Sequence, residues 1–152
     1  YGRGSISSVL AALIYVGKVA NAGDVVNVSI GGAVADRSMD IAIEGLADRG
    51  IVFVIAAGNA GVNAQQYTPA RAQHENVHTV VAMDRMDCMA SFSNYGAPPV
   101  DYAAPGVLIP SLGLNGKISI KSGTSMAVPH VAGLLFLGDV STDGYVTCGN
   151  SD

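Results

Sequence analysis

The sequence predicts an α/β fold in which helices flank a parallel β-sheet, because helical and strand patterns alternate along the chain. A helical pattern covers residues 5–19, and a β-branched run, VVNVSI, follows it at 25–30. A second helical pattern at 38–50 leads into residues 51–57, IVFVIAA, which are apolar at every position. A continuously apolar strand is typical of a sheet that is covered on both faces.

The first two helices are predicted from the spacing of their apolar residues and from the residues at their ends. The helix at 38–50 opens with Ser38 and ends at Gly50, and both residue types commonly cap helices. The helix at 5–19 has apolar side chains three and four positions apart. These side chains are Ile6, Val9, Leu10, Leu13 and Ile14.

Two further strands and a last helix complete the predicted architecture. The strands are VHTVVAM at 77–83 and KISIKS at 117–122. The helix is predicted from Ser125 to Leu137, with Pro129 in its first turn, where a missing N–H costs little. Sites in parallel sheets form beyond the carboxyl ends of the strands, where this chain has Gly31-Gly32 and Gly58-Asn59.

The composition is that of a globular protein and excludes several classes of function. Apolar residues make up 49% of the 152 residues and charged residues 13%, with a net charge of −4. A negative charge without basic clusters argues against nucleic acid as a partner. The longest apolar runs fall short of the roughly 20 residues that span a bilayer, so no membrane partner is expected. The length fits one domain or part of a larger one.

The start of the chain and its cysteines allow more than one interpretation. The opening, YGRGSISS, has no initiator Met and lacks the charged end and apolar core of a secretory signal. We therefore expect a processed chain or a fragment. Only two cysteines occur, Cys88 and Cys148, which form one disulfide in an oxidising compartment or remain free thiols.

Ser125 lies within SGTSMAVPHVAG, residues 122–133, just ahead of an apolar helical run. One interpretation is a helix cap, whose hydroxyl accepts a hydrogen bond from an unpaired amide of the first turn. The other is a nucleophile, because unpaired amides and the positive end of the helix stabilise an oxyanion that forms beside it. Ala127 stands where the second Gly of G-x-S-x-G belongs, so this is not the nucleophile elbow of the α/β-hydrolases.

The stretch SGTSMAVPHVAG resembles the serine motif of the subtilisin-like peptidases. VVNVSIGG at 25–32 is similar to the family's substrate-binding strand, and VIAAGN at 54–59 is similar to its oxyanion-hole segment. YTPA at 67–70 and SFSNYGAPPVDYAAPG at 91–106 resemble the proteinase K branch. The resemblance covers residues 1–137 and implies a subtilisin-like fold that is partial here, with its N-terminal strands missing.

The resemblance implies a serine endopeptidase that hydrolyses peptide bonds through an acyl-enzyme intermediate. Ser125 then attacks the scissile carbonyl, and the amide side of Asn59 together with the N–H of Ser125 holds the tetrahedral oxyanion. Thr124 lies beside this oxyanion hole and helps to shape it. Taken without the family, Asn59 after Gly58 is more typical of a turn.

The expected substrate is a polypeptide that binds as an added strand. The resemblance implies that it pairs with two edges of the protein, Ser29-Ile30-Gly31 and Gly2-Arg3-Gly4. Ala56-Ala57-Gly58 is expected to line the pocket for the residue before the scissile bond, and such small, uncharged walls predict broad, apolar specificity. Ile6 either borders a second pocket or packs into the core.

The base that would accept the Ser125 proton is not found in this sequence. In the family an Asp-[Ser/Thr]-Gly stretch and a His-Gly-Thr-His-like stretch come earlier, and His74, His78 and His130 do not belong to such motifs. We therefore expect residues 1–137 to be the C-terminal portion of a subtilisin-like catalytic domain. It should be inactive until a second chain or an N-terminal segment supplies Asp and His. Residues 138–152 are predicted to be a divergent loop or tail.

No cofactor is expected for catalysis, whereas the proteinase K-like pattern implies a structural calcium ion. Asp101 matches its carboxylate ligand, and the carbonyl oxygens of Glu75 and Val77 would accompany it. A solvated loop aspartate is the alternative, because one carboxylate supplies few of the roughly 6–8 oxygens that calcium takes. Thr68-Pro69 matches a peptide bond that is cis in the family. The resemblance also implies a secreted or extracellular location.

Two other classes of protein stand against the enzyme. One is a non-catalytic descendant that keeps the fold and a peptide groove. The other is a nucleotide-binding α/β domain, which is disfavoured because no G-x-G-x-x-G follows a strand. Labelling of Ser125 by a serine-directed phosphonate separates the enzyme from the peptide-binding module.

Overall fold

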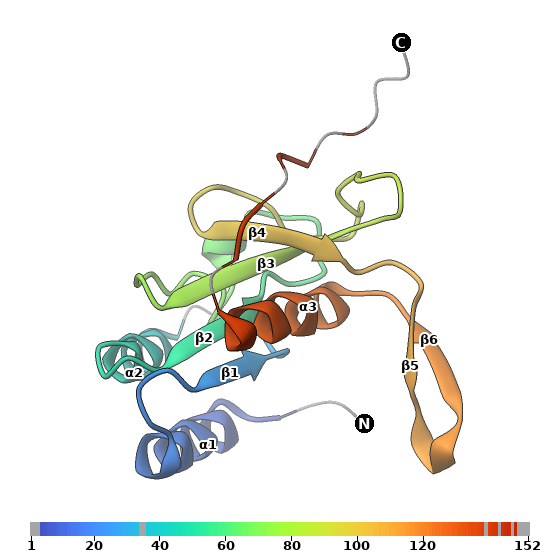
Figure 1. The fold of residues 1–152 in the computed structure, drawn as a ribbon. Helices are drawn as coiled ribbons and strands as arrows, with labels where there is room; N and C mark the ends of the chain where they lie inside the picture. The colour runs from blue at the N-terminus through green and yellow to red at the C-terminus, as the bar shows by residue number, and fades with distance from the viewer. Residues whose placement is uncertain (1–3, 34–35, 139, 143, 147, 149–152) are drawn as a thin grey trace.

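The computed structural model describes residues 4–33, 36–138, 140–142, 144–146 and 148. They form a four-stranded parallel sheet with helices on both faces, so the predicted α/β class is confirmed (Figure 1). The strands lie in chain order across the sheet. They are β1 (Val25–Val28), β2 (Val52–Ala56), β3 (Val77–Met83) and β4 (Val100–Pro105).

Side chains of the central strands alternate between two apolar cores. Phe53 and Ile55 of β2 pack against α1 (Ile6–Val19) and α2 (Arg37–Ala47) on one face of the sheet. Val54 and Ala56 point to the other face, where α3 (Thr124–Leu137) lies across all four strands (Figure 1). The strand is therefore apolar throughout because both of its faces are covered.

The helices begin where their caps allow, and one cap differs from the prediction. Ser5 caps α1 in a capping box with Ser8. The N-cap of α2 is Asp36, whose carboxylate accepts the N–H of Met39, whereas Ser38 lies inside the helix. The prediction of Ser38 as the cap was wrong because aspartate two positions earlier satisfies the first-turn amides equally well.

Helix α3 departs from the prediction at Pro129. The helix begins at Thr124 after Gly123, so Pro129 lies in its interior and not in the first turn. Gly123 has a φ of 153°, a backbone conformation that favours glycine. The helix is apolar on nearly every side, and its end leaves three large side chains exposed. These are Leu134, Phe136 and Leu137.

The segment between β4 and α3 forms a hairpin that projects from the body (Figure 1). Strand β6 (Ile118–Lys121) matches the strand predicted at 117–122, but it pairs antiparallel with β5 (Ile109–Leu112) outside the main sheet. Neither β4 nor β5 was predicted. Both contain proline, which weakens the sequence signal for a strand.

Several smaller expectations are decided by the structure. The Thr68–Pro69 bond is cis, as predicted. Cys88 and Cys148 are free thiols, and a hydrogen bond to Cys88 is the largest of the effects that raise the Cys148 pKa. Of the residues that the structure describes, no helix is long and apolar enough to cross a membrane.

Candidate active site

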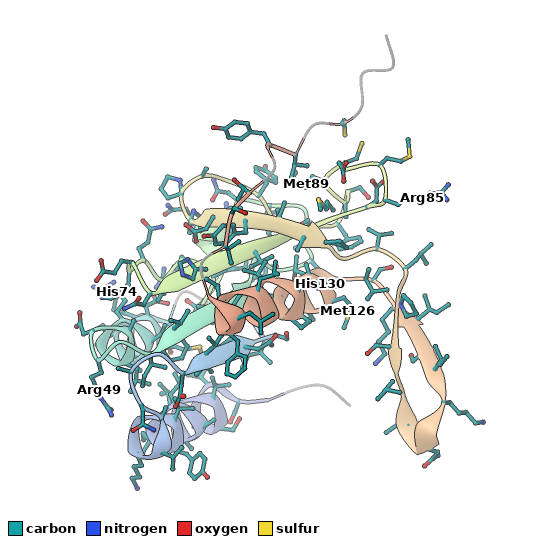
Figure 2. The ribbon with its side chains drawn as sticks, viewed as in Figure 1. Arg49, His74, Arg85, Met89, Met126 and His130 are labelled. Atoms are coloured by element: carbon teal, nitrogen blue, oxygen red, sulfur yellow. The ribbon has the colours of Figure 1, made fainter. Side chains whose placement is uncertain are left out.

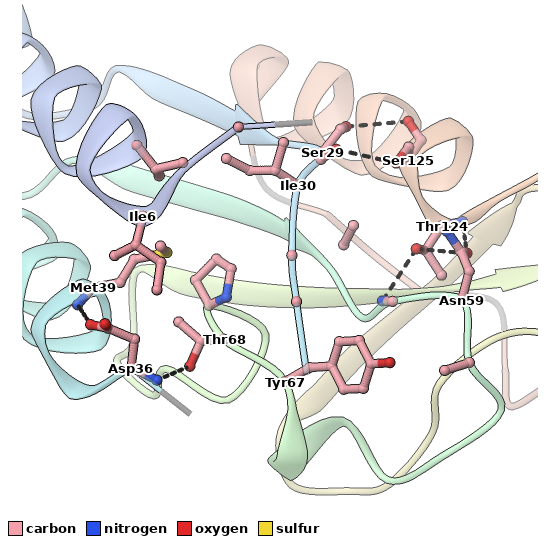
Figure 3. A pocket seen from close by; sticks show the side chains of 18 of the residues that line it. Ile6, Ser29, Ile30, Asp36, Met39, Asn59, Tyr67, Thr68, Thr124 and Ser125 are labelled. Carbon is pink, nitrogen blue, oxygen red and sulfur yellow. Dashed lines mark hydrogen bonds between the residues drawn. The ribbon is translucent and has the colours of Figure 1, made fainter. Parts of the chain in front are cut away.

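The carboxyl ends of β1 and β2 meet the N-terminus of α3 at a cleft of about 620 Å³. The loops after the two strands supply its walls, as the topology of a parallel sheet predicts. The structure brings most of the predicted site residues together here (Figure 3). They are Gly4, Ile6, Ser29, Ile30, Gly31, Ala56, Gly58, Asn59, Thr124 and Ser125.

One predicted substrate-binding residue, Ala57, lies outside the cleft lining. Ala57 does not line the cleft, because its side chain is fully buried in the core beneath α1 and α2. The expectation that it forms a pocket wall was therefore wrong, since successive residues of an extended chain point to opposite sides. Gly2 and Arg3 lie outside the described residues.

Ser125 is the second residue of α3, and its hydroxyl does not cap the helix. The N-cap is Gly123, which has no side chain. The Ser125 Oγ instead donates a hydrogen bond to the carbonyl oxygen of Ser29, at 3.2 Å. The Ser125 N–H has no hydrogen-bond partner among the described residues. The tip of α3 therefore presents a hydroxyl and an unpaired amide to the same cleft.

Thr124 fixes the orientation of the Asn59 carboxamide. The Asn59 Oδ1 accepts hydrogen bonds from the Thr124 N–H at 2.8 Å and from the Thr124 Oγ1 at 3.1 Å. The Thr124 hydroxyl in turn accepts the Gly58 N–H at 3.2 Å. Because a backbone amide can only donate, the oxygen of Asn59 must face Thr124, and its Nδ2 is turned away from that residue.

Asn94 holds the loop that carries Asn59, and the sequence did not single it out. It is fully buried, and its Oδ1 accepts the N–H groups of Ala60 at 3.0 Å and Val62 at 3.2 Å. Its Nδ2 donates to the Ala57 carbonyl oxygen at 2.8 Å. The only signal for this role was the position of Asn94 within the stretch SFSNYG, which resembles the family.

The lining of the cleft continues past residues 30–32 to Ile6, Asp36 and Met39, which lie away from Ser125 (Figure 3). Ile6 lines this part of the cleft together with Met39, and its expected role at a second pocket stays a prediction. Asp36 also lines it and is the only charged residue on the cleft wall within the described part of the chain. The predicted small, uncharged walls therefore apply to the half beside Ser125, and the far half carries a carboxylate.

None of the three histidines lines the cleft in the part of the chain that the structure describes. His74 pairs with Asp48 at 3.1 Å, and the His130 Nδ1 lies 2.9 Å from the carbonyl oxygen of Met126 within α3 (Figure 2). The ring of His78 lies against Tyr102, and burial lowers the His78 pKa. That no histidine of this sequence serves as the base stays a prediction.

Asp101 lies on β4 beside the start of β3. Its Oδ2 accepts the Thr79 N–H at 2.7 Å. Partial desolvation raises the Asp101 pKa, while the Thr79 hydrogen bond and the nearby His78 act in the opposite direction. Within the described residues, no three His, Cys, Asp or Glu side chains gather in a way that could hold a metal ion. Any cation here would depend on a single carboxylate and on backbone oxygens.

The fold and the site together define a parallel α/β protein with a serine-centred site at a helix tip. Comparison with known proteins gives the family. The family model described as "Subtilase family" matches residues 2–137, and the chain belongs to this family. The sequence-based recognition of a subtilisin-like peptidase is thereby confirmed.

The chain is similar to several subtilisin-like proteases. It is 43% identical over 136 residues to subtilisin-like protease 1 of Pseudogymnoascus destructans, covering 88% of this chain and 33% of that protein. It is 41% identical over 144 residues to proteinase T of Parengyodontium album, covering 90% of this chain and 48% of that protein. The chain thus spans between a third and a half of the length of these relatives.

A solved structure shares the fold. The crystal structure of a cold adapted subtilisin-like serine proteinase matches with a TM-score of 0.83 and 38% identity. The match covers 90% of this chain and 48% of that one. The subtilisin-like fold predicted from the motifs is therefore confirmed for the described residues.

Proposed function

We propose that this chain supplies the nucleophile and the oxyanion hole of a subtilisin-like serine endopeptidase. The observation that carries the proposal is the fixed orientation of Asn59. Its oxygen accepts both the N–H and the hydroxyl of Thr124, so its Nδ2 is available to an oxyanion beside Ser125. Donors that are oriented before the reaction stabilise developing charge without reorganisation.

In the proposed reaction the Ser125 Oγ bonds to the scissile carbonyl carbon while its proton passes to a histidine. The carbonyl oxygen becomes an oxyanion between the Ser125 N–H and the Asn59 Nδ2. The C–N bond then breaks, and the departing amine takes the proton. Water then attacks the carbonyl carbon of the acyl-Ser125 ester while one of its protons passes to the histidine. The ester C–O bond breaks, and the Ser125 Oγ takes the proton back as the acid product leaves.

The histidine and its aspartate have to come from outside this sequence. We propose that a second chain, or an N-terminal segment of a longer protein, supplies both. The Ser125 hydroxyl donates its one proton to the Ser29 carbonyl oxygen at 3.2 Å, so it has to turn from that acceptor to the histidine when the base arrives. The same proposal includes a secreted location, because the family resemblance implies one.

The substrate is proposed to be a polypeptide in extended conformation. The backbone of Ser29, Ile30 and Gly31 would pair with it as a neighbouring strand. Beside Ser125, Ala56 and Gly58 give the cleft small walls that suit an apolar side chain. Asp36, in the part of the cleft away from Ser125, would favour a basic side chain several residues before the scissile bond.

Phosphonate labelling tests the proposal. The chain is combined with a segment that carries the Asp and His motifs and is treated with a peptidyl phosphonate. Modification of Ser125 is expected. The variant Asn59→Ala should react roughly 10²–10³-fold more slowly. This magnitude is the one known for the oxyanion-hole asparagine of a subtilisin, which belongs to the same family. Asn21→Ala, at an exposed position on the loop before β1, is the matched control. Peptide binding without any labelling would identify a non-catalytic module instead.

We further propose a structural calcium ion at Asp101. The donors fit a hard cation in kind, because the Asp101 carboxylate and the carbonyl oxygens of Glu75 and Val77 are all oxygens. Bound there, calcium would tie β4 to the start of β3 and take no part in the reaction. Thermal unfolding with calcium and with chelator tests this, using Asp101→Asn as a control. Equal midpoints under both conditions would remove the proposal.

A further inference from the structure

Pro129 leaves one backbone carbonyl of the site without its normal partner. In a helix the N–H of each residue bonds to the carbonyl oxygen four positions earlier, and proline has no N–H. Pro129 lies inside α3, and the residue four positions before it is Ser125. The carbonyl of the proposed nucleophile therefore loses its helical hydrogen bond, and the proline ring also crowds that carbonyl.

The hydroxyl of Ser29 replaces that missing donor. The Ser29 Oγ donates to the Ser125 carbonyl oxygen at 3.2 Å, and Asn27 Nδ2 donates to the Ser29 Oγ at 2.7 Å. A hydroxyl has only one proton to give. Because Asn27 occupies an acceptor position of the Ser29 hydroxyl, the single proton of that hydroxyl is directed to Ser125.

A second hydrogen bond runs in the opposite direction between the same two residues. The Ser125 Oγ donates to the Ser29 carbonyl oxygen at 3.2 Å (Figure 3). Ser29 follows directly on β1, which pairs along its length with β2. The backbone and the side chain of Ser125 are thus both attached to the rigid end of the sheet.

We propose that Ser29 is a positioning residue for Ser125, and that its hydroxyl replaces the amide that Pro129 lacks. The hydrogen bond from the Ser29 hydroxyl to the Ser125 carbonyl sets the tilt of the first turn of α3 and thereby the position of the Ser125 Oγ. The bond from the Ser125 Oγ to Ser29 has to break when the Ser125 hydroxyl turns its one proton to a base. The effect on chemistry rests on the proposed function of Ser125. The relation between Ser29 and Pro129 rests on the fold alone and can be tested separately.

Positioning of this kind matters because a small misplacement of a reacting group costs much of its rate. Helix α3 could not hold Ser125 in this way by itself, since the proline removes the bond that would fix this turn. The end of β1 can hold Ser125, because the Ser29 hydroxyl supplies the missing donor. The same strand end carries the backbone proposed to pair with substrate. Ser29 would then position both the nucleophile and the substrate relative to the end of β1.

A double-mutant cycle in chemical unfolding tests the structural half. Ser29→Ala should raise the equilibrium constant for unfolding about 5-fold in the parent chain, the size of one net hydrogen bond, because the exposed Asn27 amide can bond to water instead. Pro129→Ala restores an N–H opposite the Ser125 carbonyl, so Ser29→Ala should cost little in that background. Ser29→Thr keeps a hydroxyl and should resemble the parent. Ser119→Ala, on the projecting hairpin, should show no coupling to Pro129→Ala.

Phosphonate labelling with the Asp- and His-bearing segment tests the functional half. Ser29→Ala should lower the limiting labelling rate about 5- to 10-fold while the half-saturating concentration stays unchanged. The double variant with Pro129→Ala should recover most of that loss. Additive effects in the unfolding cycle, or an unchanged limiting rate in Ser29→Ala, would overturn the proposal. If the parent chain is never labelled, the proposed function fails, and the unfolding cycle still decides the role of Ser29.

Discussion

Replacing Thr124 with valine removes one hydroxyl from a fully buried side chain and keeps its shape. The hydroxyl makes two hydrogen bonds, to the Asn59 Oδ1 at 3.1 Å and from the Gly58 N–H at 3.2 Å. Each is worth about 1 kcal/mol net, so the free energy of unfolding should fall by about 2 kcal/mol. For a chain of this size the midpoint of thermal unfolding should fall by roughly 4–8 °C.

The same change should slow chemistry less than the loss of Asn59 does. The Thr124 N–H still holds the Asn59 Oδ1 at 2.8 Å, so the carboxamide is loosened and not released. We expect phosphonate labelling to slow by about 10-fold, against the roughly 10²–10³-fold for removal of an oxyanion donor. The control is Thr124→Ser, which keeps the hydroxyl. Labelling as fast as in the parent, or as slow as in Asn59→Ala, would refute the reasoning.

Three further substitutions have defined outcomes. Arg71→Met should lower the free energy of unfolding by roughly 3–5 kcal/mol in chemical denaturation, because Asp40 is 2% exposed and loses the guanidinium that lies 2.6 Å from its carboxylate. The double variant with Asp40→Asn should recover part of the lost stability. Gly58→Ala should lower the midpoint of thermal unfolding sharply, since an added Cβ would collide with the Asn94 side chain and Gly58 has a φ of 106°, which disfavours alanine. An unchanged midpoint would contradict the packing described. Asp36→Asn keeps the helix cap and should weaken binding of basic peptides about 2- to 5-fold relative to apolar ones in fluorescence titrations.

The sequence predicted the elements whose residues carry a strong local signal. β2 is apolar throughout because it is covered on both faces, and β3 was predicted with its correct ends. β4 was missed because a surface-exposed Asp101 and a terminal proline interrupt its apolar pattern. Its place in the sheet is decided by pairing with β3, a long-range contact that no local pattern contains.

The candidate site divides in the same way. Ser125 and Asn59 were identified because their motifs are contiguous in the chain. The roles of Asn94 and of the Ser29 hydroxyl could not be predicted, since each depends on atoms that are distant in sequence. Asp36 was not singled out as a cleft residue, because its place on the cleft depends on contacts made only after folding, such as that of its N–H with the Thr68 hydroxyl. Local sequence therefore indicates the proposed reacting groups, and tertiary structure identifies the residues that hold them.

The exposed end of α3 has a practical consequence for producing this chain. Phe136 is 73% and Leu137 83% exposed, and the projecting hairpin adds Leu112 at 86% and Ile118 at 75%. Apolar surface of this extent drives non-specific association in water. Recombinant material made on its own should accumulate in inclusion bodies or bind chaperones. Co-expression with the proposed Asp- and His-bearing portion is the sensible first route to soluble protein.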